Sequence, residues 1–356
     1  MSAPRAISVL IDTYQQGRFV ARAVESVLMQ THPAHEIVVV DDGSTDDTAS
    51  ELARFGDRIR VLRQSNQGQA GALNEGLAAL TGPWVAFLDG DDAWETQHLE
   101  LIAAATERDA ECDAVFAPMR RIDDQDRLLS LDPPDAVLAE TRQTLTDPAA
   151  ARAGLMLWFP PTSGLACRRD LLLDAGPIPL DYRISADGWV QVVLAVRARR
   201  IALIGERSVR LRVHLDNRWT GRDELDSQLL TRRRDLYERL AAAVGPLARA
   251  HHGYGAHDVD RVNRVNADGL ATSLASQAAE FAIWELFVQG HRGAALALAL
   301  RWTASPALPS TWHRAFRRVQ LVLATLVPAR WYLALRRAWR LRIRPRDSHS
   351  ASPAAP

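Results

Sequence analysis

Lysine is absent from this sequence of 356 residues, in which all 43 strongly basic residues are arginine. The 43 acidic residues balance them to a formal net charge of +0, so no overall positive field points to a nucleic acid partner. We interpret the exclusive use of arginine as a compositional bias of the source, and not as the signature of a functional site. Only two cysteines occur, Cys112 and Cys167, without CxxC spacing. That scarcity excludes a disulfide scaffold and a zinc knuckle, and it favours a reducing compartment.

Long apolar runs and two common nucleotide motifs are also missing. The uncharged stretches near the C-terminus, such as Val319 to Ala329, fall short of the roughly 20 residues that span a bilayer. A strand pattern begins almost at once and leaves no room for a signal peptide, so we expect a cytosolic protein. No GxGxxG follows the first strand, which excludes a Rossmann dehydrogenase, and no GxxxxGK[ST] occurs, which excludes a P-loop NTPase.

The first hundred residues alternate between short strand patterns and helical patterns. The predicted strands are Ile7–Ile11, Glu36–Val40, Arg58–Leu62 and Trp84–Leu88, and the predicted helices are Phe19–Gln30, Thr45–Phe55 and Gly68–Leu80. Strands without internal alternation, separated by helices, predict a mainly parallel sheet covered on both faces, which is an α/β fold. In such sheets, ligands bind beyond the carboxyl ends of the strands.

The rest of the chain is less regular. We expect a helix near Gln97–Arg108, a strand near Ala114–Met119, a polar loop over Asp123–Pro148, a strand around Gly164–Cys167 and a helix near Trp189–Arg199. After Asn217 the pattern is helical, most clearly over Leu229–Val244 and Ala267–Gln289. We therefore predict a first domain over residues 1–216 and a helical C-terminal region over 217–356.

Three of the predicted strands end in polar residues: "DTY" after Ile11, "DDGSTDDT" after Val40 and "DGDD" after Leu88. In the second of these, Ser44 and Thr45 suit a helix cap, and the aspartates after them suit a helix N-terminus. Asp42 precedes the cap, where its carboxylate can accept a hydrogen bond from a nucleotide.

The third strand end carries the Asp89-Gly90-Asp91 motif. Its two carboxylates would lie at the mouth of the sheet, and the glycine allows close backbone approach. Such oxygen ligands suit Mg²⁺ or Mn²⁺, which would also hold diphosphate oxygens. A DxD motif is weak alone, but this one is the third polar strand end in a row.

Two stretches carry a resemblance to a known family. They are "ISVLIDTYQQGRFVARAVESVLMQTHPAHEIVVVDDGSTDDT" and "NQGQAGALNEGLAALTGPWVAFLDGDDAW". Together they resemble the nucleotide-sugar-binding half of family 2 glycosyltransferases with the GT-A fold, over roughly residues 6 to 100 and more loosely to about 215. The resemblance implies a nucleotide-sugar-binding half at 1–100 and an acceptor-side half at 101–216.

The resemblance also implies roles for individual residues. Thr13 and Tyr14 lie where the family's first strand end contacts the nucleobase, and Asp42 matches the residue that holds the base, usually a pyrimidine. Asp89 would contact ribose or metal, and Asp91 would bind the divalent ion, Mg²⁺ or Mn²⁺, that bridges the diphosphate.

The acidic pair that the family places before a helix is replaced here by Ala186-Asp187. Asp187 would be the general base, a role compatible with its alternative interpretation as a helix N-cap. The missing first acid leaves open a catalytically inactive, nucleotide-sugar-binding or scaffolding relative.

Two further segments depart from the family or only partly resemble it. Asp12 and Gln15 replace the usual Pro and Asn around the tyrosine, and Asp12 adds a carboxylate near the base pocket. The segment "VRLRVH" resembles the one that closes over the donor, which makes Arg212 a candidate donor contact and His214 a candidate metal ligand.

The implied reaction is transfer of a sugar, with inversion, from a nucleotide diphosphate sugar to a hydroxyl of a glycan or lipid-linked acceptor, in cell-surface or secreted glycan assembly. The residues from Trp158 to Cys167 should face the acceptor. They contain no motif from which the sugar or the acceptor can be inferred.

Two sequence features lie outside this resemblance. His251, His252 and His257 are interpreted as part of a flexible loop and not as a metal site. Arginines and apolar residues alternate over 313–346. That segment is either a helix pair on the catalytic domain or a basic amphipathic surface on an anionic membrane, at the inner face of the plasma membrane.

Overall fold

The structure is a computed structural model, and it describes residues 6–129, 161–214, 227–249 and 259–303. The chain divides into two compact units. The first comprises Met1–Asp223 and Arg232–Ala278, and the second comprises Glu224–Thr231 and Ala279–Pro356.

A seven-stranded sheet forms the centre of the first unit, in the order β3-β2-β1-β4-β8-β6-β9. Its strands are β1 (Ile7–Thr13), β2 (Glu36–Asp41), β3 (Arg60–Arg63), β4 (Trp84–Asp89), β6 (Cys112–Phe116), β8 (Leu165–Arg168) and β9 (Arg200–Leu203). All neighbouring pairs are parallel except those made by β8, which is antiparallel to β4 and to β6. The predicted, mainly parallel sheet is confirmed.

The register of β1 brings polar strand ends together. Asp12 lies opposite Asp89 of β4, and Thr13 lies opposite Asp41 of β2. Because the three strands are parallel, their carboxyl ends meet at one edge of the sheet, where a ligand site is expected.

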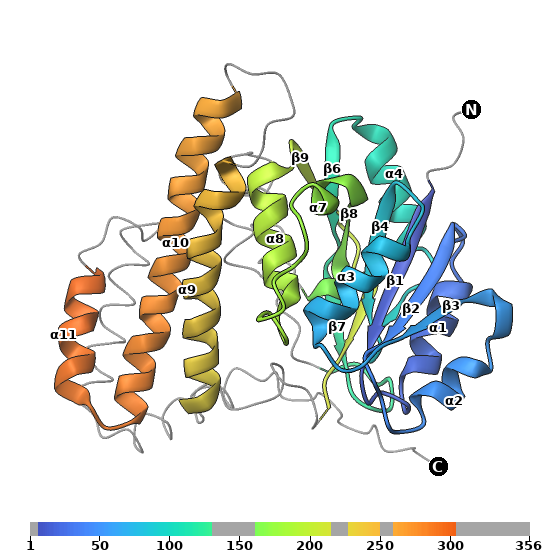
Figure 1. The fold of residues 1–356 in the computed structure, drawn as a ribbon, viewed down its shortest axis with the longest axis horizontal. Coiled ribbons are helices and arrows are strands. Elements are labelled where there is room, and N and C mark those ends of the chain that lie inside the picture. The colour runs from blue at the N-terminus through green and yellow to red at the C-terminus, as the bar shows by residue number, and fades with distance from the viewer. Residues whose placement is uncertain (1–5, 130–160, 215–226, 250–258, 304–356) are drawn as a thin grey trace, which may run out of the picture. The chain divides into compact units, whose positions relative to one another are not determined.

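Helices cover both faces of the sheet (Figure 1). On one face, α3 (Gln69–Ala79), α7 (Arg169–Leu173) and α8 (Ala186–Arg197) share a core with strand residues such as Val38 and Phe87. On the other, α1 (Val20–Leu28), α2 (Thr48–Ala53) and α4 (His98–Arg108) pack on alternate residues such as Val39 and Leu88. This burial on both faces explains why the strands read as continuous apolar runs.

A second, three-stranded sheet has the order β5-β10-β7, with β5 (Ala93–Trp94), β7 (Met119–Ile122) and β10 (Val209–Arg212). The strand predicted near Ala114–Met119 is found as β6, which ends earlier than predicted, at Phe116. The chain leaves the large sheet after Phe116 and enters the small one at Met119, and Pro118 between them has no N–H to donate to a ladder.

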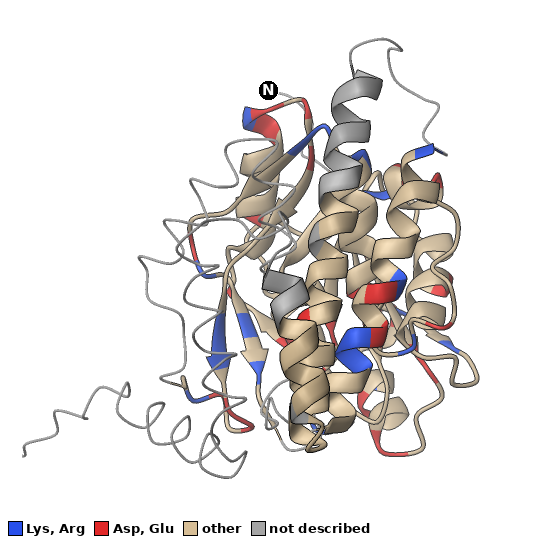
Figure 2. Cartoon of the chain, turned by 90° about the vertical axis from the view of Figure 1, so that its left-hand side faces the viewer, with Lys and Arg blue, Asp and Glu red and all other residues tan. Residues whose placement is uncertain are grey.

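The helices after residue 226 are α9 (Ser227–Arg249), α10 (Val259–Val288) and α11 (Arg292–Thr303). Leu240 of α9 and Leu274 of α10 join the core of the first unit, whereas Ile283, Phe287 and Ala295 form a core in the second. Among the described residues, no helix is both long enough and apolar enough to cross a membrane. Acidic and arginine residues are interspersed over the described elements in Figure 2.

Several sequence predictions fall outside the described residues. They are the domain boundary at 216, the His251–His257 cluster, most of the polar loop over Asp123–Pro148, and the 313–346 segment. These stay predictions.

Candidate active site

Carboxylates at the carboxyl ends of β1 and β4, with one from the first turn of α8, form a group that we call the acidic cluster: Asp12, Asp89, Asp91, Asp92 and Asp187. The turn after β4 is tight, with the Asp92 N–H donating to the Asp89 carbonyl over 3.0 Å. Gly90 packs so closely on the β1 end that a Cβ there would lie 2.5 Å from Gln16 Oε1 and 2.7 Å from Thr13 Oγ1. Any side chain at position 90 would force the turn away from β1.

Asp89, Asp91 and Asp92 each offer an oxygen within 4.8 Å of the other two. Asp89 Oδ1 is buried and has no hydrogen-bond partner. Burial, followed by the charges of Asp12, Asp92, Asp91 and Asp187, holds the pKa of Asp89 well above its usual range. A hard divalent cation would relieve this repulsion and occupy the open oxygen, so the residues present fit Mg²⁺ or Mn²⁺.

Asp12 lies beside Asp89 and belongs to the acidic cluster, as the register of β1 on β4 requires. Burial, with a smaller effect from the charge of Asp91, raises the pKa of Asp12 to about 7. Its Oδ1 is also buried without a hydrogen-bond partner. The extra carboxylate seen in the sequence is therefore adjacent to the DxD motif.

Asp187 comes from the other half of the domain. The N-cap of α8 is Ser185, so Asp187 lies in the first turn of the helix and is not the N-cap. Its Oδ1 accepts the N–H of Gly188 over 2.9 Å, and burial raises the pKa of Asp187 to about 6. Because its charge raises the pKa of Asp89, Asp187 lies within electrostatic reach of the DxD motif.

The start of α3 joins the start of α8 to the site. Gln69 donates its N–H to the carbonyl of Arg183 over 2.8 Å, and its Oε1 accepts the N–H of Ala186 over 3.1 Å. Gly68, with φ +80°, makes this approach possible, since a Cβ there would lie 2.7 Å from the Arg183 oxygen. Sequence reasoning missed Gln69.

The predicted nucleobase residues lie near the ends of β1 and β2. The Tyr14 side chain is 37% exposed, whereas Thr13 is buried and donates to Gln16 Oε1 over 2.9 Å. Asp42 is 3% exposed, and it accepts hydrogen bonds from Gln64 Nε2 at 2.7 Å and from the N–H groups of residues 67 and 68 at 2.8 Å each. In this structure Asp42 ties β2 to the loop before α3, and its contact with a base stays a prediction.

Arg212 and His214 both touch the DxD turn. The Arg212 side chain is fully buried, and its guanidinium lies over the ring of Phe19. Its Nε donates to the Asp91 carbonyl at 2.7 Å, and its Nη2 donates to Asp126 Oδ1 at 2.6 Å. Nε2 of His214 lies 3.0 Å from Asp91 Oδ2. These contacts place Arg212 behind the turn. Its predicted contact with the donor and the predicted ligation by His214 stay predictions.

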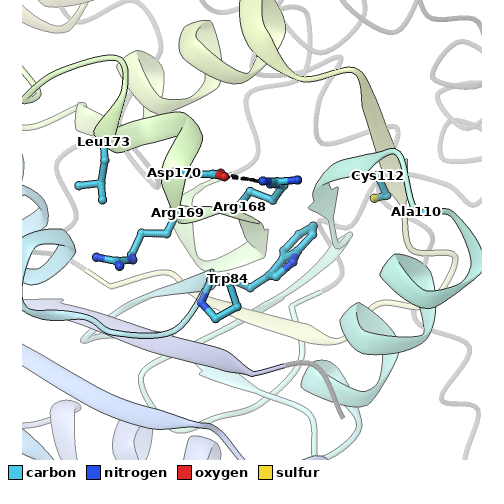
Figure 3. Close-up of a pocket in the computed structure, with 8 residues that line it drawn as sticks. Trp84, Ala110, Cys112, Arg168, Arg169, Asp170 and Leu173 are labelled. Carbon is cyan, nitrogen blue, oxygen red and sulfur yellow. Dashed lines mark hydrogen bonds and ion pairs between the residues drawn. The ribbon is translucent and has the colours of Figure 1, made fainter. Parts of the chain in front are cut away.

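A pocket of about 320 Å³ lies at the opposite edge of the large sheet, where β4 and β6 begin and β8 ends (Figure 3). Arg168 pairs with Asp170 there, and Arg169 donates to the carbonyls of Gly82 at 3.0 Å and Leu77 at 3.3 Å. Arg169 thus links the start of α7 to α3 and to the loop before β4, and the pocket lies away from the acidic cluster.

Comparisons with known proteins find related sequences. Residues 8–151 match the family described as glycosyl transferase family 2. An uncharacterized glycosyltransferase from Nostoc sp. (strain PCC 7120) is 38% identical over 215 residues, which cover 58% of this chain and 65% of that protein. Glycosyltransferase GlyG from Streptococcus pneumoniae serotype 4 is 35% identical over 125 residues, covering 34% of this chain and 41% of GlyG. The chain thus spans less than two thirds of the length of these relatives.

The fold is also found among solved structures. Residues 1–349 of S. aureus TarS, in complex with UDP-GlcNAc, superpose with a TM-score of 0.57 at 15% identity, covering 95% of this chain and 92% of that one. At this identity the likeness shows the fold alone, and it confirms the predicted GT-A fold.

Proposed function

We propose that this protein is an inverting glycosyltransferase, which moves a sugar from a nucleotide diphosphate sugar to an acceptor hydroxyl. One observation carries the proposal. The first turn of α8 brings a carboxylate with a raised pKa, that of Asp187, to within electrostatic reach of Asp89, which opens the DxD motif at the end of β4. Such a site would combine a place for a cation and a diphosphate with a separate base.

The DxD carboxylates would hold the divalent ion. Asp89 offers its open Oδ1, and Asp91 offers a carboxylate at the surface of the turn, 13% exposed. When bound, Mg²⁺ or Mn²⁺ would neutralise the negative charge that builds up on the departing diphosphate. Arg212 holds the main chain of this turn in place.

Asp187 would act as general base. Its carboxylate takes the proton of the acceptor hydroxyl as that oxygen attacks the anomeric carbon, while the bond to the diphosphate oxygen breaks and its electron pair leaves with the diphosphate. A carboxylate with a pKa of about 6 is a stronger base than an ordinary aspartate and is still ionised at neutral pH. No covalent enzyme intermediate is required.

A catalytically inactive relative is the second candidate, because Ala186 replaces the first acid of the family's pair. Incubation of the full chain with Mn²⁺ and a panel of nucleotide diphosphate sugars separates the two. We expect release of nucleoside diphosphate with at least one sugar, and loss of that release in Asp187→Asn. Binding without any release, across donors and added acceptors, would favour the inactive relative.

Donor, acceptor and location complete the proposal. UDP-sugars are the first donors to test, since UDP-GlcNAc is the ligand named for TarS. We propose a glycan or lipid-linked acceptor in cell-surface or secreted glycan assembly. The enzyme would work in the cytoplasm, with the basic segment 313–346 in peripheral contact with an anionic membrane.

A further inference from the structure

Asp92 follows the DxD motif directly and shares its acidic cluster, but its contacts differ from those of Asp89. Asp92 is only 1% exposed, and both of its carboxylate oxygens accept hydrogen bonds from the protein. Oδ2 accepts from Ser163 Oγ over 2.5 Å, and Oδ1 accepts from the N–H of Arg212 over 2.8 Å. A carboxylate held in this way is suited to fixing the backbone around it.

Ser163 closes the other side of the same turn. Its Oγ donates to Asp92 and accepts the N–H of Asp89 over 3.0 Å, so one hydroxyl bridges the first and last residues of the Asp89–Asp92 turn. Ser163 is fully buried, and its carbonyl accepts the indole N–H of Trp94 over 2.8 Å. The hydroxyl therefore has a fixed position with respect to β4.

Arg212 reaches the middle of the turn. Its N–H holds Asp92, and its Nε holds the carbonyl of Asp91 over 2.7 Å. The guanidinium is held in turn by Asp126 Oδ1 at 2.6 Å and by the carbonyl of Asp123 at 2.9 Å. Hydrogen bonds thus hold three of the four residues of the turn, which are Asp89, Asp91 and Asp92. The partners are Arg212 at the end of β10 and Ser163 just before β8.

We propose that Ser163 and Asp92, together with Arg212, are positioning residues for the metal site, and that Asp92 is a strut and not a ligand of the ion. The proposal rests on the metal-dependent function proposed above. Groups that orient the ligands of a metal typically contribute about 10–100-fold to its affinity. A shift of about 1 Å in a ligand is enough to impair such a site.

Ser163→Ala tests the positioning role, because it removes a hydroxyl that contacts Asp89 and Asp92 and that is not proposed as a ligand of the ion. The full chain would be titrated with Mn²⁺ alone, and the free ion would be followed by electron paramagnetic resonance. We expect the affinity for Mn²⁺ to fall about 10–100-fold. Ser8→Ala is the matched control. Ser8 is also fully buried and donates to Glu36 at 2.7 Å, but it lies in the amino-terminal part of β1. It should lower thermal stability without changing the affinity for Mn²⁺.

A pair of variants at Asp92 separates a strut from a ligand, even if Ser163→Ala fails to fold. Asn keeps an acceptor for Arg212 and a polar contact for Ser163, whereas Ala removes both. A strut predicts that Asp92→Asn loses much less Mn²⁺ affinity than Asp92→Ala. For a ligand, as proposed for Asp91, the two substitutions should be about equally damaging.

The outcomes also separate this inference from the function on which it rests. If the wild-type chain binds no Mn²⁺, or if Asp91→Asn binds it as well as wild type does, the metal-dependent function itself fails. If Asp91→Asn loses Mn²⁺ but Ser163→Ala binds it like wild type, only the positioning role is wrong. Equal losses in Asp92→Asn and Asp92→Ala would make Asp92 a ligand and overturn the strut.

Discussion

Asp187→Asn should make the protein more stable while it destroys turnover. Burial raises the pKa of Asp187 from 3.8 to about 6. The folded state therefore binds more protons than the unfolded state between these two pH values, and stability is lost as pH rises through that window. Each pKa unit corresponds to about 1.4 kcal/mol, so the ionised carboxylate costs up to about 3 kcal/mol above the window. Asparagine keeps the shape and can still accept from Gly188, but it does not titrate.

The experiment compares thermal unfolding of wild type and Asp187→Asn at about pH 8 and about pH 4. We expect the variant to be more stable by up to about 3 kcal/mol at the higher pH and nearly equal to wild type at the lower. Turnover should fall by about 10²–10⁴-fold, while donor binding remains. Asp57→Asn, at an exposed carboxylate in the 3-10 helix before β3, is the control and should change neither quantity. A variant that is less stable at about pH 8 but still turns over would show that Asp187 is structural.

Four further outcomes are expected. Asp91→Ala should abolish transfer with its thermal transition nearly unchanged, and full activity in that variant or in excess chelator would contradict a metal-dependent mechanism. The value of kcat/KM should rise with pH to about 6 and then level off, as Asp187 loses its proton; a profile flat down to about pH 4 would point to another base. Thermal shifts with a panel of nucleotide diphosphate sugars should identify the donor, and stabilisation confined to adenine dinucleotides would overturn the family's substrate class. The full chain should sediment with anionic liposomes at low salt and be released at high salt, because the attraction is electrostatic; no sedimentation would mean that 313–346 does not bind membranes.

The strands of the first hundred residues were predicted well from the sequence, because their signals are local. The strands that became β1, β2 and β4 are buried on both faces, so each one appears as an uninterrupted apolar run that ends in polar residues. Because the strands pair in parallel, their polar ends meet at one edge of the sheet, and this could be predicted without knowing the exact register. The position of Asp12 beside Asp89 was missed, because it depends on the register between two strands that are more than 70 residues apart.

The parts that sequence reasoning missed depend on contacts between distant segments. Ser163 is one small residue in an unremarkable "PTSG" stretch, and its role appears only when it meets Asp89 and Asp92 across 74 and 71 residues. The segment "VRLRVH" was noticed, and the contact of Arg212 with the donor stays a prediction. The hydrogen bonds of its guanidinium to main-chain oxygens and to Asp126 are indicated by no local pattern.

The antiparallel strand β8 has a consequence for how the protein is made. It lies between β4 and β6, although it is built from residues 165–168, and the buried bond between Asp92 and Arg212 joins residues 120 positions apart. At a synthesis rate of about 5–20 residues per second, β4 and its aspartates leave the ribosome about 6–24 seconds before Arg212 does. Until residues 163–168 have been made, the β4 edge has no β8 beside it and the acidic turn lacks the Ser163 hydroxyl; until Arg212 follows, the turn also lacks the guanidinium. The chain is therefore exposed to mispairing and aggregation during the period of synthesis in which only its N-terminal half has been made.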